Sequence, residues 1–242
     1  MNSGIFYALV TYIMWGILPI YWKQFHHISS TQLIGHRILW SFIVLILMII
    51  FTRQWGKFRK KMDAPTLKVH GISALLLSVN WLTYVWAINA GFIVETSLGY
   101  FINPLFSVLL GMIFLKEKLR AMQWIPLGLA ILGVLYLTFV YGRLPWIALL
   151  LASTFGIYGL LKKKSALGSL YGLTLETGIM LLPALGYLIY EISRGQGIFL
   201  KINPATDFLL IGAGVATSVP LLLFALAAQR IPLTMIGLMQ YI

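Results

Sequence analysis

The chain has 242 residues, of which 60% are hydrophobic and only 10% are charged. A soluble domain has about 25% charged residues, so this chain lacks the polar surface of a water-soluble fold, and it is too apolar for a disordered protein. Cysteine is absent, which excludes disulfides, thiolate metal sites and a cysteine nucleophile. The formal charge of +12 comes from 18 Lys and Arg against 6 Asp and Glu, and its meaning depends on where these residues lie.

Nine apolar segments follow one another along the chain, joined by short segments that mostly contain Lys, Arg, Gly or Pro. A helix needs about 20 apolar residues to cross the hydrocarbon core of a bilayer, and the first eight segments approach that length. The pattern predicts an all-α, multi-pass membrane protein. The segments are approximately residues 4–22, 31–52, 68–90, 95–115, 123–141, 145–161, 170–190, 206–228 and 232–242.

The first and last segments need separate arguments. No basic residues precede the first segment and no small-residue cleavage site follows it, so we predict a membrane span and not a signal peptide. The last segment has 11 residues, which at about 1.5 Å per residue cover half of the bilayer. We therefore expect the sequence to be a C-terminally truncated fragment of a longer chain.

The basic residues are distributed unequally between the two sides of the predicted membrane. The loops after the second, fourth, sixth and eighth segments contain 13 of the 18 Lys and Arg, and the loops on the other side contain four. The positive-inside rule places the more basic side, and with it the N-terminus, in the cytoplasm. A nucleic-acid-binding patch is disfavoured because the basic residues lie in short clusters beside the spans.

Two groups of similar residues recur at nearly the same distance along the chain. Residues 86–90 (WAINA) resemble residues 224–228 (FALAA) at an offset of 138, and residues 15–17 (WGI) resemble residues 155–157 (FGI) at an offset of 140. This spacing indicates a duplication, with residues 1–141 as the first repeat and 142–242 as the second. Five spans per repeat is an odd number, so the second repeat is inverted in the membrane, as in many transporters. The full fold would be a helical bundle of ten spans, of which about nine are present here.

Charged residues within the spans are the first candidates for a functional path, because each costs about 2.5–3.5 kcal/mol to insert. Arg37 lies in the second segment and Glu176 in the seventh, at equivalent positions of the two repeats. Snorkelling of Arg37 to the headgroups and a protonated, structurally satisfied Glu176 are the alternatives to a pathway role. The two backbones are expected to differ in depth, so we do not predict a direct ion pair. His36 is a third candidate, with a helix–helix hydrogen bond as its commoner alternative.

Polar residues form a stripe on one face of the third segment and another on the fourth. Residues spaced by three and four positions share a helix face, and polar atoms facing lipid would be unsatisfied, so both stripes should face the bundle interior. Lining of a solute path and hydrogen bonding between helices remain equal alternatives. The stripes consist of Asn80, Thr83 and Tyr84, and of Thr96, Tyr100, Asn103 and Ser107.

Three acidic residues have local interpretations. Glu95 begins the fourth segment, where a helix N-terminus favours an anion. Glu117 lies between two lysines and is expected to be solvated, and Asp207 is expected to cap the eighth segment.

The sequence contains no GxxxxGK[ST], HExxH or GxSxG motif and no paired carboxylates within the spans. It therefore predicts no ATP hydrolysis, no catalytic residues, no metal site and no cofactor. A proton or ion gradient, or facilitated exchange, would remain as the energy source. Besides Arg37, we identify Glu176 and His36 as the titratable candidates in the interior, so proton coupling would depend on them.

The chain resembles a known family in several motifs spread over its whole length. These include His36-Arg37 with Trp40-Ser41, Asn80-Trp81 with Tyr84, Tyr158-Gly159-Leu160, Val219-Pro220-Leu221 and Gln240-Tyr241-Ile242. The most specific is the run from Glu95 to Pro104. By these residues the chain is similar to RarD-type members of the EamA family in the drug/metabolite transporter superfamily.

The resemblance implies ten spans in two inverted halves, cytoplasmic termini, and export or exchange of small organic molecules, including drugs such as chloramphenicol. We therefore expect an inner-membrane secondary transporter of small amphipathic solutes in a bacterium, working by alternating access. Arg37, His36 and Glu176 would be its charged pathway residues, and five others would line a central cavity: Asn80, Tyr84, Tyr100, Asn103 and Gln240.

Two other classes of protein remain as alternatives. A non-transporting membrane interaction protein would need no polar centre. An integral-membrane enzyme acting on lipid would need a base and a nucleophile at one interface, where only His26, His27 and Glu95 are available. The substrate, the direction of transport, the coupling ion and the oligomeric state are left open by the sequence.

Overall fold

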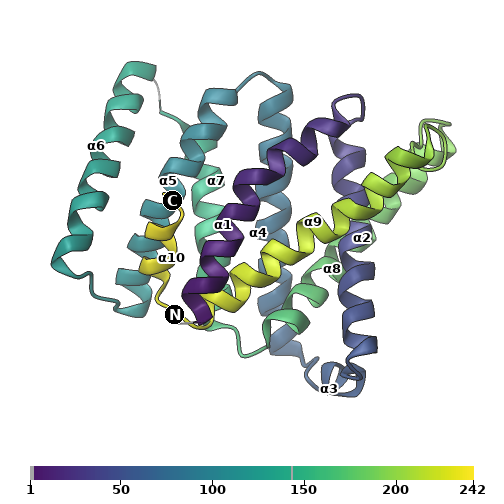
Figure 1. The fold of residues 1–242 in the computed structure, drawn as a ribbon, viewed down its shortest axis with the longest axis horizontal. Coiled ribbons are helices and arrows are strands. Elements are labelled where there is room, and N and C mark those ends of the chain that lie inside the picture. The colour runs from purple at the N-terminus through teal and green to yellow at the C-terminus, as the bar shows by residue number, and fades with distance from the viewer. Residues whose placement is uncertain (1–2, 143) are drawn as a thin grey trace. The chain divides into compact units, whose positions relative to one another are not determined.

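The computed structural model describes residues 3–142 and 144–242, and within them every regular element is a helix. Eight of these helices are long and apolar enough to cross a membrane, which confirms the predicted all-α, multi-pass class. They are α1 (Ser3–Trp22), α2 (Ser30–Phe51), α4 (Ala64–Asn89), α5 (Ile93–Leu115), α6 (Trp124–Tyr141), α7 (Trp146–Lys164), α8 (Ser169–Ser193) and α9 (Pro204–Ala228) (Figure 1).

The other regular elements of the described residues are short helices. The ninth apolar segment forms α10 (Leu233–Met239), and α3 (Trp55–Lys60) lies in the basic loop between α2 and α4. Two single 3₁₀ turns, Lys23–Phe25 and Ala121–Gln123, follow α1 and precede α6. Arg143, one of the basic residues on the less basic side, lies outside the described residues.

The start of α4 differs from the prediction. The sequence placed this boundary at Lys68, but the helix begins four residues earlier, at Ala64. The cause is local, because the Asp63 side chain accepts a hydrogen bond from the amide of Thr66 at 2.9 Å and so caps the first turn. The earlier start adds residues 64–67 to the helix, so the residues just after Lys68 lie one turn further from its beginning.

The described chain divides into two compact units, each built from both halves of the sequence. The first unit contains residues 3–9, 76–164 and 225–242, and the second contains residues 10–75 and 165–224. Helices α1, α4 and α9 therefore contribute residues to both units.

In the first unit, α5 packs against α7 on one side and α10 on another. Leu98 and Ile102 of α5 form a buried cluster with Ala148 and Ala152 of α7. The approach of α10 is equally close, since a Cβ atom on Gly237 would lie only 2.7 Å from the carbonyl oxygen of Pro104. Small residues therefore bring the polar residues of α5 near both neighbours.

In the second unit, α2 packs against α8 and α9. A Cβ on Gly178 of α8 would lie 3.0 Å from the Phe42 ring, and a Cβ on Gly214 of α9 would overlap the backbone of α2. These contacts fix the depth of the polar residues on α2 relative to those on α8 and α9.

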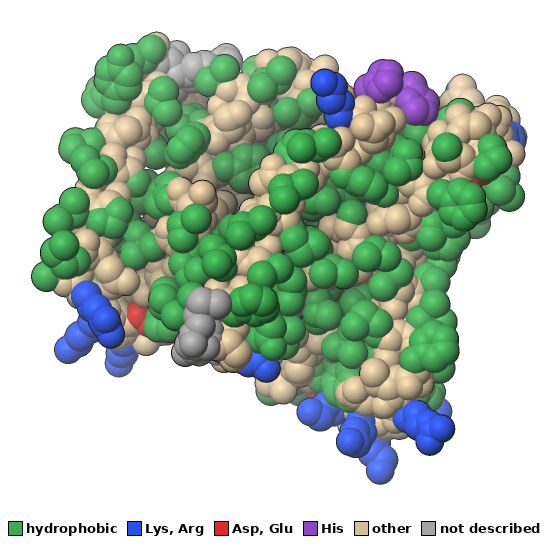
Figure 2. Space-filling view, viewed as in Figure 1, with side chains coloured by type: hydrophobic (Ala, Val, Ile, Leu, Met, Phe, Trp, Pro, Cys, Tyr) green, Lys and Arg blue, Asp and Glu red, His purple; other side chains and the backbone are tan. Residues whose placement is uncertain are grey.

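Large hydrophobic side chains remain exposed on the outer sides of the long helices, as expected for a surface that faces lipid. On α6, for example, Leu129, Leu132 and Phe139 are all exposed. Figure 2 shows hydrophobic side chains along the helices, with Lys and Arg near the ends of helices and in loops. Such a surface suits a hydrocarbon solvent and not water.

Candidate functional site

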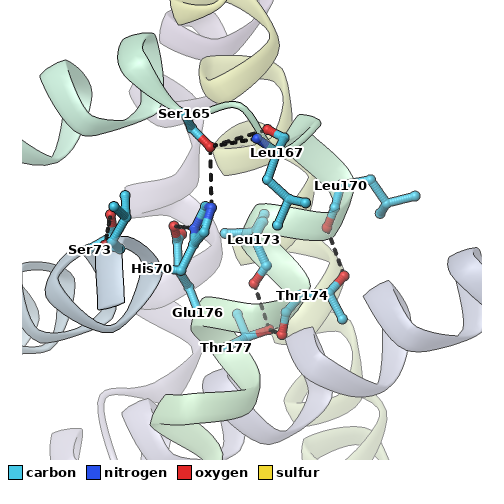
Figure 3. A network of polar contacts seen from close by, with 10 residues as sticks. His70, Ser73, Ser165, Leu167, Leu170, Leu173, Thr174, Glu176 and Thr177 are labelled. Atoms are coloured by element: carbon cyan, nitrogen blue, oxygen red, sulfur yellow. Dashed lines mark hydrogen bonds and ion pairs between the residues drawn. The ribbon is translucent and has the colours of Figure 1, made fainter. Parts of the chain in front are cut away.

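The most deeply buried titratable pair in the second unit joins α4 to α8. The Nδ1 atom of His70 lies 2.7 Å from the Oε1 atom of Glu176, and the two side chains are 2% and 0% exposed (Figure 3). A buried carboxylate is costly unless it is paired and hydrogen-bonded, and the imidazole supplies that partner here.

A third residue extends this pair to the loop between α7 and α8. The Oγ atom of Ser165 lies 3.2 Å from Nε2 of His70, so both ring nitrogens have partners. The same Oγ accepts a hydrogen bond from the Leu167 amide at 3.1 Å and lies 3.3 Å from the Leu167 carbonyl oxygen. Ser165 is only partly buried, whereas His70 and Glu176 are enclosed.

The imidazole ring occupies space that a glycine leaves open. A Cβ atom at Gly172, one turn before Glu176 on α8, would lie 2.7 Å from Cε1 of His70. The absence of a side chain at this position therefore allows the ring to lie against α8 and reach the carboxylate.

His70 is a buried titratable residue that was not predicted from the sequence, so the restriction of such interior candidates to Glu176 and His36 was wrong. His70 lies only two residues after Lys68, the predicted start of the third segment, and it was not among the predicted candidates. The observed start at Ala64 places it six residues into α4. The signal that would have revealed it is Asp63 followed by Pro65, a typical helix N-terminus.

Arg37 and His36 have different surroundings in the same unit. The Nε atom of Arg37 donates to Oγ1 of Thr217 at 3.0 Å, and its guanidinium lies 4.4 Å from the centre of the Trp22 ring. His36 is buried, with its ring packed against Phe199 at 5.6 Å. Arg37 thus contacts Trp22 of α1 and Thr217 of α9, and Glu176 contacts His70 of α4.

In the first unit, Asn80 bonds directly to α7. Its Nδ2 atom donates to the Leu151 carbonyl and to Oγ1 of Thr154, both at 2.9 Å. This geometry is that of a helix–helix hydrogen bond, the alternative to path lining considered above.

Asn103 and Gln240 lie together where α5 meets α10. The Nδ2 atom of Asn103 donates to Oε1 of Gln240 at 2.7 Å. The buried Oδ1 atom of Asn103 has no hydrogen-bond donor within residues 3–142 and 144–242. A buried acceptor without a donor is uncommon, and leaving it unsatisfied costs free energy unless water or a ligand donates to it.

The two predicted tyrosines of this unit meet edge to face. The Tyr84 and Tyr100 ring centres are 5.9 Å apart at 74°. The fourth-segment stripe is only partly interior, because Thr96, Asn103 and Ser107 are buried while Tyr100 is 57% exposed. The 100° rotation per residue places Tyr100 at the edge of the buried face.

Two local expectations for acidic residues were wrong. Glu117 is half-buried, and its carboxylate accepts hydrogen bonds from the amides of Leu233 and Thr234 at 2.9 and 2.8 Å, so it caps α10. The cap of α9 is Asn203, which accepts from the Thr206 amide at 2.8 Å, while Asp207 accepts from the Leu200 amide. In both cases the side chain reached a backbone group that sequence spacing alone did not indicate.

Glu95 begins α5 as expected, in its first turn, but it is buried. It lines a cavity of about 220 Å³ between α5 and α6 whose other lining residues are mostly apolar.

Comparison with known proteins agrees with this architecture. The EamA-like transporter family matches residues 2–139. The chain is 44% identical to the Uncharacterized transporter YojE of Bacillus subtilis (strain 168) and 41% identical to Protein RarD of Escherichia coli (strain K12), each over 100% of this chain and 82% of the relative. A solved structure described only as "Crystal structure of protein" has a TM-score of 0.70 at 16% identity, covering 99% of this chain and 84% of that one, which supports the fold.

Eight helices able to cross a membrane, with polar groups buried in the protein, define a multi-pass helical membrane protein. The chain belongs to the EamA-like transporter family, and the resemblance to RarD-type proteins inferred from its sequence is confirmed.

Proposed function

We propose that the protein is a secondary transporter that moves small amphipathic organic solutes across a bacterial inner membrane by alternating access. Membership of the EamA-like transporter family supports the class of activity. The observation that carries the solute class is the buried Oδ1 atom of Asn103, which has no donor within the described residues although it lies at the contact of α5 and α10.

The chemistry around Asn103 suits a solute with polar and aromatic parts. A hydroxyl or amide of the solute would donate to Oδ1, which satisfies an acceptor that otherwise remains unpaired in a medium of low polarity. One turn earlier on α5, the exposed ring of Tyr100 lies edge-on to Tyr84 and offers an aromatic surface. Hydrogen bonding and ring contact together favour amphipathic solutes over inorganic ions.

The pattern of helix starts supports two repeats, residues 1–141 and 142–242. Helices α7, α8, α9 and α10 begin 139 to 143 residues after α1, α2, α4 and α5, respectively. An odd number of spans in each repeat would give them opposite orientations. With the basic loops on the cytoplasmic side, the N-terminus would also be cytoplasmic.

Other predicted residues retain a proposed role in the path. Arg37, His36 and Glu176 would provide charge or hydrogen bonds in the second unit, and Gln240 would orient Asn103 in the first. Prolines inside α5, α8 and α9 (Pro104, Pro183 and Pro220) each remove a backbone hydrogen bond and provide points at which these helices can flex. Such flexing is what alternating access requires.

The test is transport by the purified full chain in proteoliposomes. Flux of radiolabelled chloramphenicol is measured, and the metabolites of a cell extract that enter vesicles with and without the protein are compared by mass spectrometry. Asn103→Ala and Tyr100→Ala are expected to reduce the flux at least tenfold, by about 1.4 kcal/mol or more of lost binding. The matched control is Tyr136→Ala, because Tyr136 on α6 is similarly exposed, at 68%.

Two results would contradict the proposal at different levels. If both path variants transport as well as the control, these residues do not contact the solute. If no compound distinguishes vesicles with the protein from those without it, the protein does not transport, and a membrane interaction protein becomes the better interpretation.

A further inference from the structure

We propose that His70 and Glu176 bind one exchangeable proton, that the proton reaches them through Ser165, and that its binding and release drive the transport proposed above. This inference rests on the proposed function for its coupling step. The proton site itself stands on the geometry of three side chains in the second unit.

The hydrogen bonds around His70 allow two protonation states. In the empty state, neutral His70 donates from Nδ1 to the Glu176 carboxylate, and Nε2 accepts from the Ser165 hydroxyl, 3.2 Å away. In the loaded state, Nε2 carries the added proton and donates to Oγ of Ser165, while Nδ1 still donates to Glu176. The gain is one proton, with no other bond made or broken.

Ser165 has a second acceptor that makes this exchange possible. When Nε2 becomes a donor, the serine hydroxyl must turn away, and the Leu167 carbonyl oxygen lies 3.3 Å from Oγ to receive it. The Leu167 amide donates to Oγ in both states, at 3.1 Å. Each donor of His70, Ser165 and Leu167 in this row therefore finds an acceptor whether the proton is bound or absent.

Burial increases along the row of three residues in the direction a proton would travel. Ser165 lies in a loop and is partly exposed, His70 is 2% exposed, and Glu176 is fully enclosed. A hydroxyl can accept a proton from water on one side while it passes its own to a ring nitrogen on the other. The residues thus connect the surface of the loop to a carboxylate inside the span.

The charge of the pair changes between the two states. The empty pair carries one net negative charge, and the loaded pair is a neutral combination of imidazolium and carboxylate. A buried net charge is much more costly than a buried neutral pair, so loading changes which surroundings the pair tolerates. Because the empty and loaded pairs differ in net charge, a bound proton can favour one conformation of the transporter over another.

Other charged groups on neighbouring elements of the second unit have contacts of their own. Lys68, on α4, is exposed. Charged groups with defined partners include Arg37 with Thr217, Lys61 with the Tyr171 ring, Asp63 with the Thr66 amide, Glu191 with Gln32, and Asp207 with the Leu200 amide.

The first experiment follows the proton directly, with no transported solute. The full chain, containing ¹⁵N-labelled histidine, is placed in lipid nanodiscs, and His70 is assigned by the signal lost in His70→Gln. As the pH is lowered, the wild-type ring should change from one protonated nitrogen to two. Glu176→Gln should move this change to lower pH, because the loaded ring loses its counter-charge.

Glu191→Gln is the matched control, because Glu191 is also a buried carboxylate of α8 but bonds to Gln32. It should leave the His70 titration as in the wild type. Ser165→Ala should reduce the doubly protonated form, since Nε2 loses its acceptor. A wild-type His70 that stays in one protonation state throughout, or a titration that Glu176→Gln does not alter, would overturn the proton site.

The second experiment tests coupling in proteoliposomes with chloramphenicol as the probe. Exchange of labelled for unlabelled compound at equal pH requires transport but no proton movement, whereas uphill accumulation requires coupling. With one proton per neutral solute, a pH difference of one unit drives up to about tenfold accumulation. His70→Gln should retain exchange and lose accumulation in both gradient directions. Glu176→Gln should also lose accumulation, while Glu191→Gln retains both exchange and accumulation.

The outcomes separate the two proposals. Wild-type exchange without accumulation, or unchanged accumulation in Glu176→Gln, overturns proton coupling and leaves the transport function intact. Absence of exchange by the wild type counts against the transport proposal and removes the coupling step, while the titration of His70 still decides the proton site.

Discussion

Replacement of Gly214 by alanine tests the contact between α2 and α9 that positions Arg37. A Cβ atom at this position would overlap the carbonyl carbon of Trp40 and would lie 2.5 Å from Trp40 Cβ and 2.7 Å from the Ser41 amide nitrogen. Two of these atoms belong to the backbone, so rotation of a side chain cannot relieve the overlap. To restore ordinary contacts of 3.4 Å, the two helices must separate by about 1 Å at this point.

The separation would break two hydrogen bonds between the helices. Oγ of Ser41 donates to the Gly214 carbonyl at 3.1 Å, and Nε of Arg37 donates to Thr217 at 3.0 Å. An added separation of about 1 Å along either bond takes it beyond hydrogen-bonding distance. Overpacking of this kind costs about 1–3 kcal/mol, against which alanine gains up to about 1 kcal/mol in helix propensity. We expect a net destabilisation of about 1–2 kcal/mol.

The assay is unfolding of the purified full chain in detergent, followed by tryptophan fluorescence. Gly186→Ala on α8 is the control, because nothing lies within 4 Å of the added Cβ and only the propensity gain remains. Gly214→Ala should unfold more readily than the wild type, and Gly186→Ala should not. If Gly214→Ala is as stable as Gly186→Ala, the close approach of α2 and α9 described here is incorrect.

Three further predictions concern single hydrogen-bonding groups. Glu117→Ala should speed hydrogen exchange at the first amides of α10 roughly fivefold, since loss of a cap costs about 1 kcal/mol; unchanged exchange would exclude capping. Asn80→Leu should destabilise the protein by about 0.6–1.7 kcal/mol in the same unfolding assay, because two bonds to α7 are lost, whereas equal stability would mean that they contribute nothing. Hydrogen bonds from the Thr66 side chain and amide hold the pKa of the Asp63 carboxyl below its ordinary value. This cap therefore supports α4 above the ordinary pKa and is lost as pH falls through the lowered one; carbon NMR that shows an ordinary midpoint would contradict it.

The sequence predicted the helices well because their cause is local. Eight spans were recognised from apolar length alone, and each has its helix within a few residues of the predicted bounds. The largest consequence came from a small error at α4, where Lys68 was taken as the boundary although Asp63 caps the helix. His70 thus lies six residues into α4 instead of two, so a boundary shifted by one turn changes the depth at which a titratable residue is expected.

The partners of the polar residues could not be predicted in the same way. Glu176 and His70 are 106 residues apart in the chain, and Asn103 and Gln240 are 137 apart. Their meeting depends on which helices pack together, at what depth and with what rotation. Sequence spacing placed Tyr100 with three buried residues, yet its side chain is largely exposed because it lies at the edge of that face.

By itself, the sequence determined that this is a multi-pass helical membrane protein of the EamA-like family, because apolar length and motif content are properties of contiguous residues. Only the tertiary structure decided that Glu176 meets His70 and that Asn103 has an unsatisfied acceptor, because both depend on close approach of helices distant in the chain. The physical reason is that a bilayer selects apolar segments one at a time, whereas a buried polar atom is satisfied only by whatever another helix brings within about 3 Å.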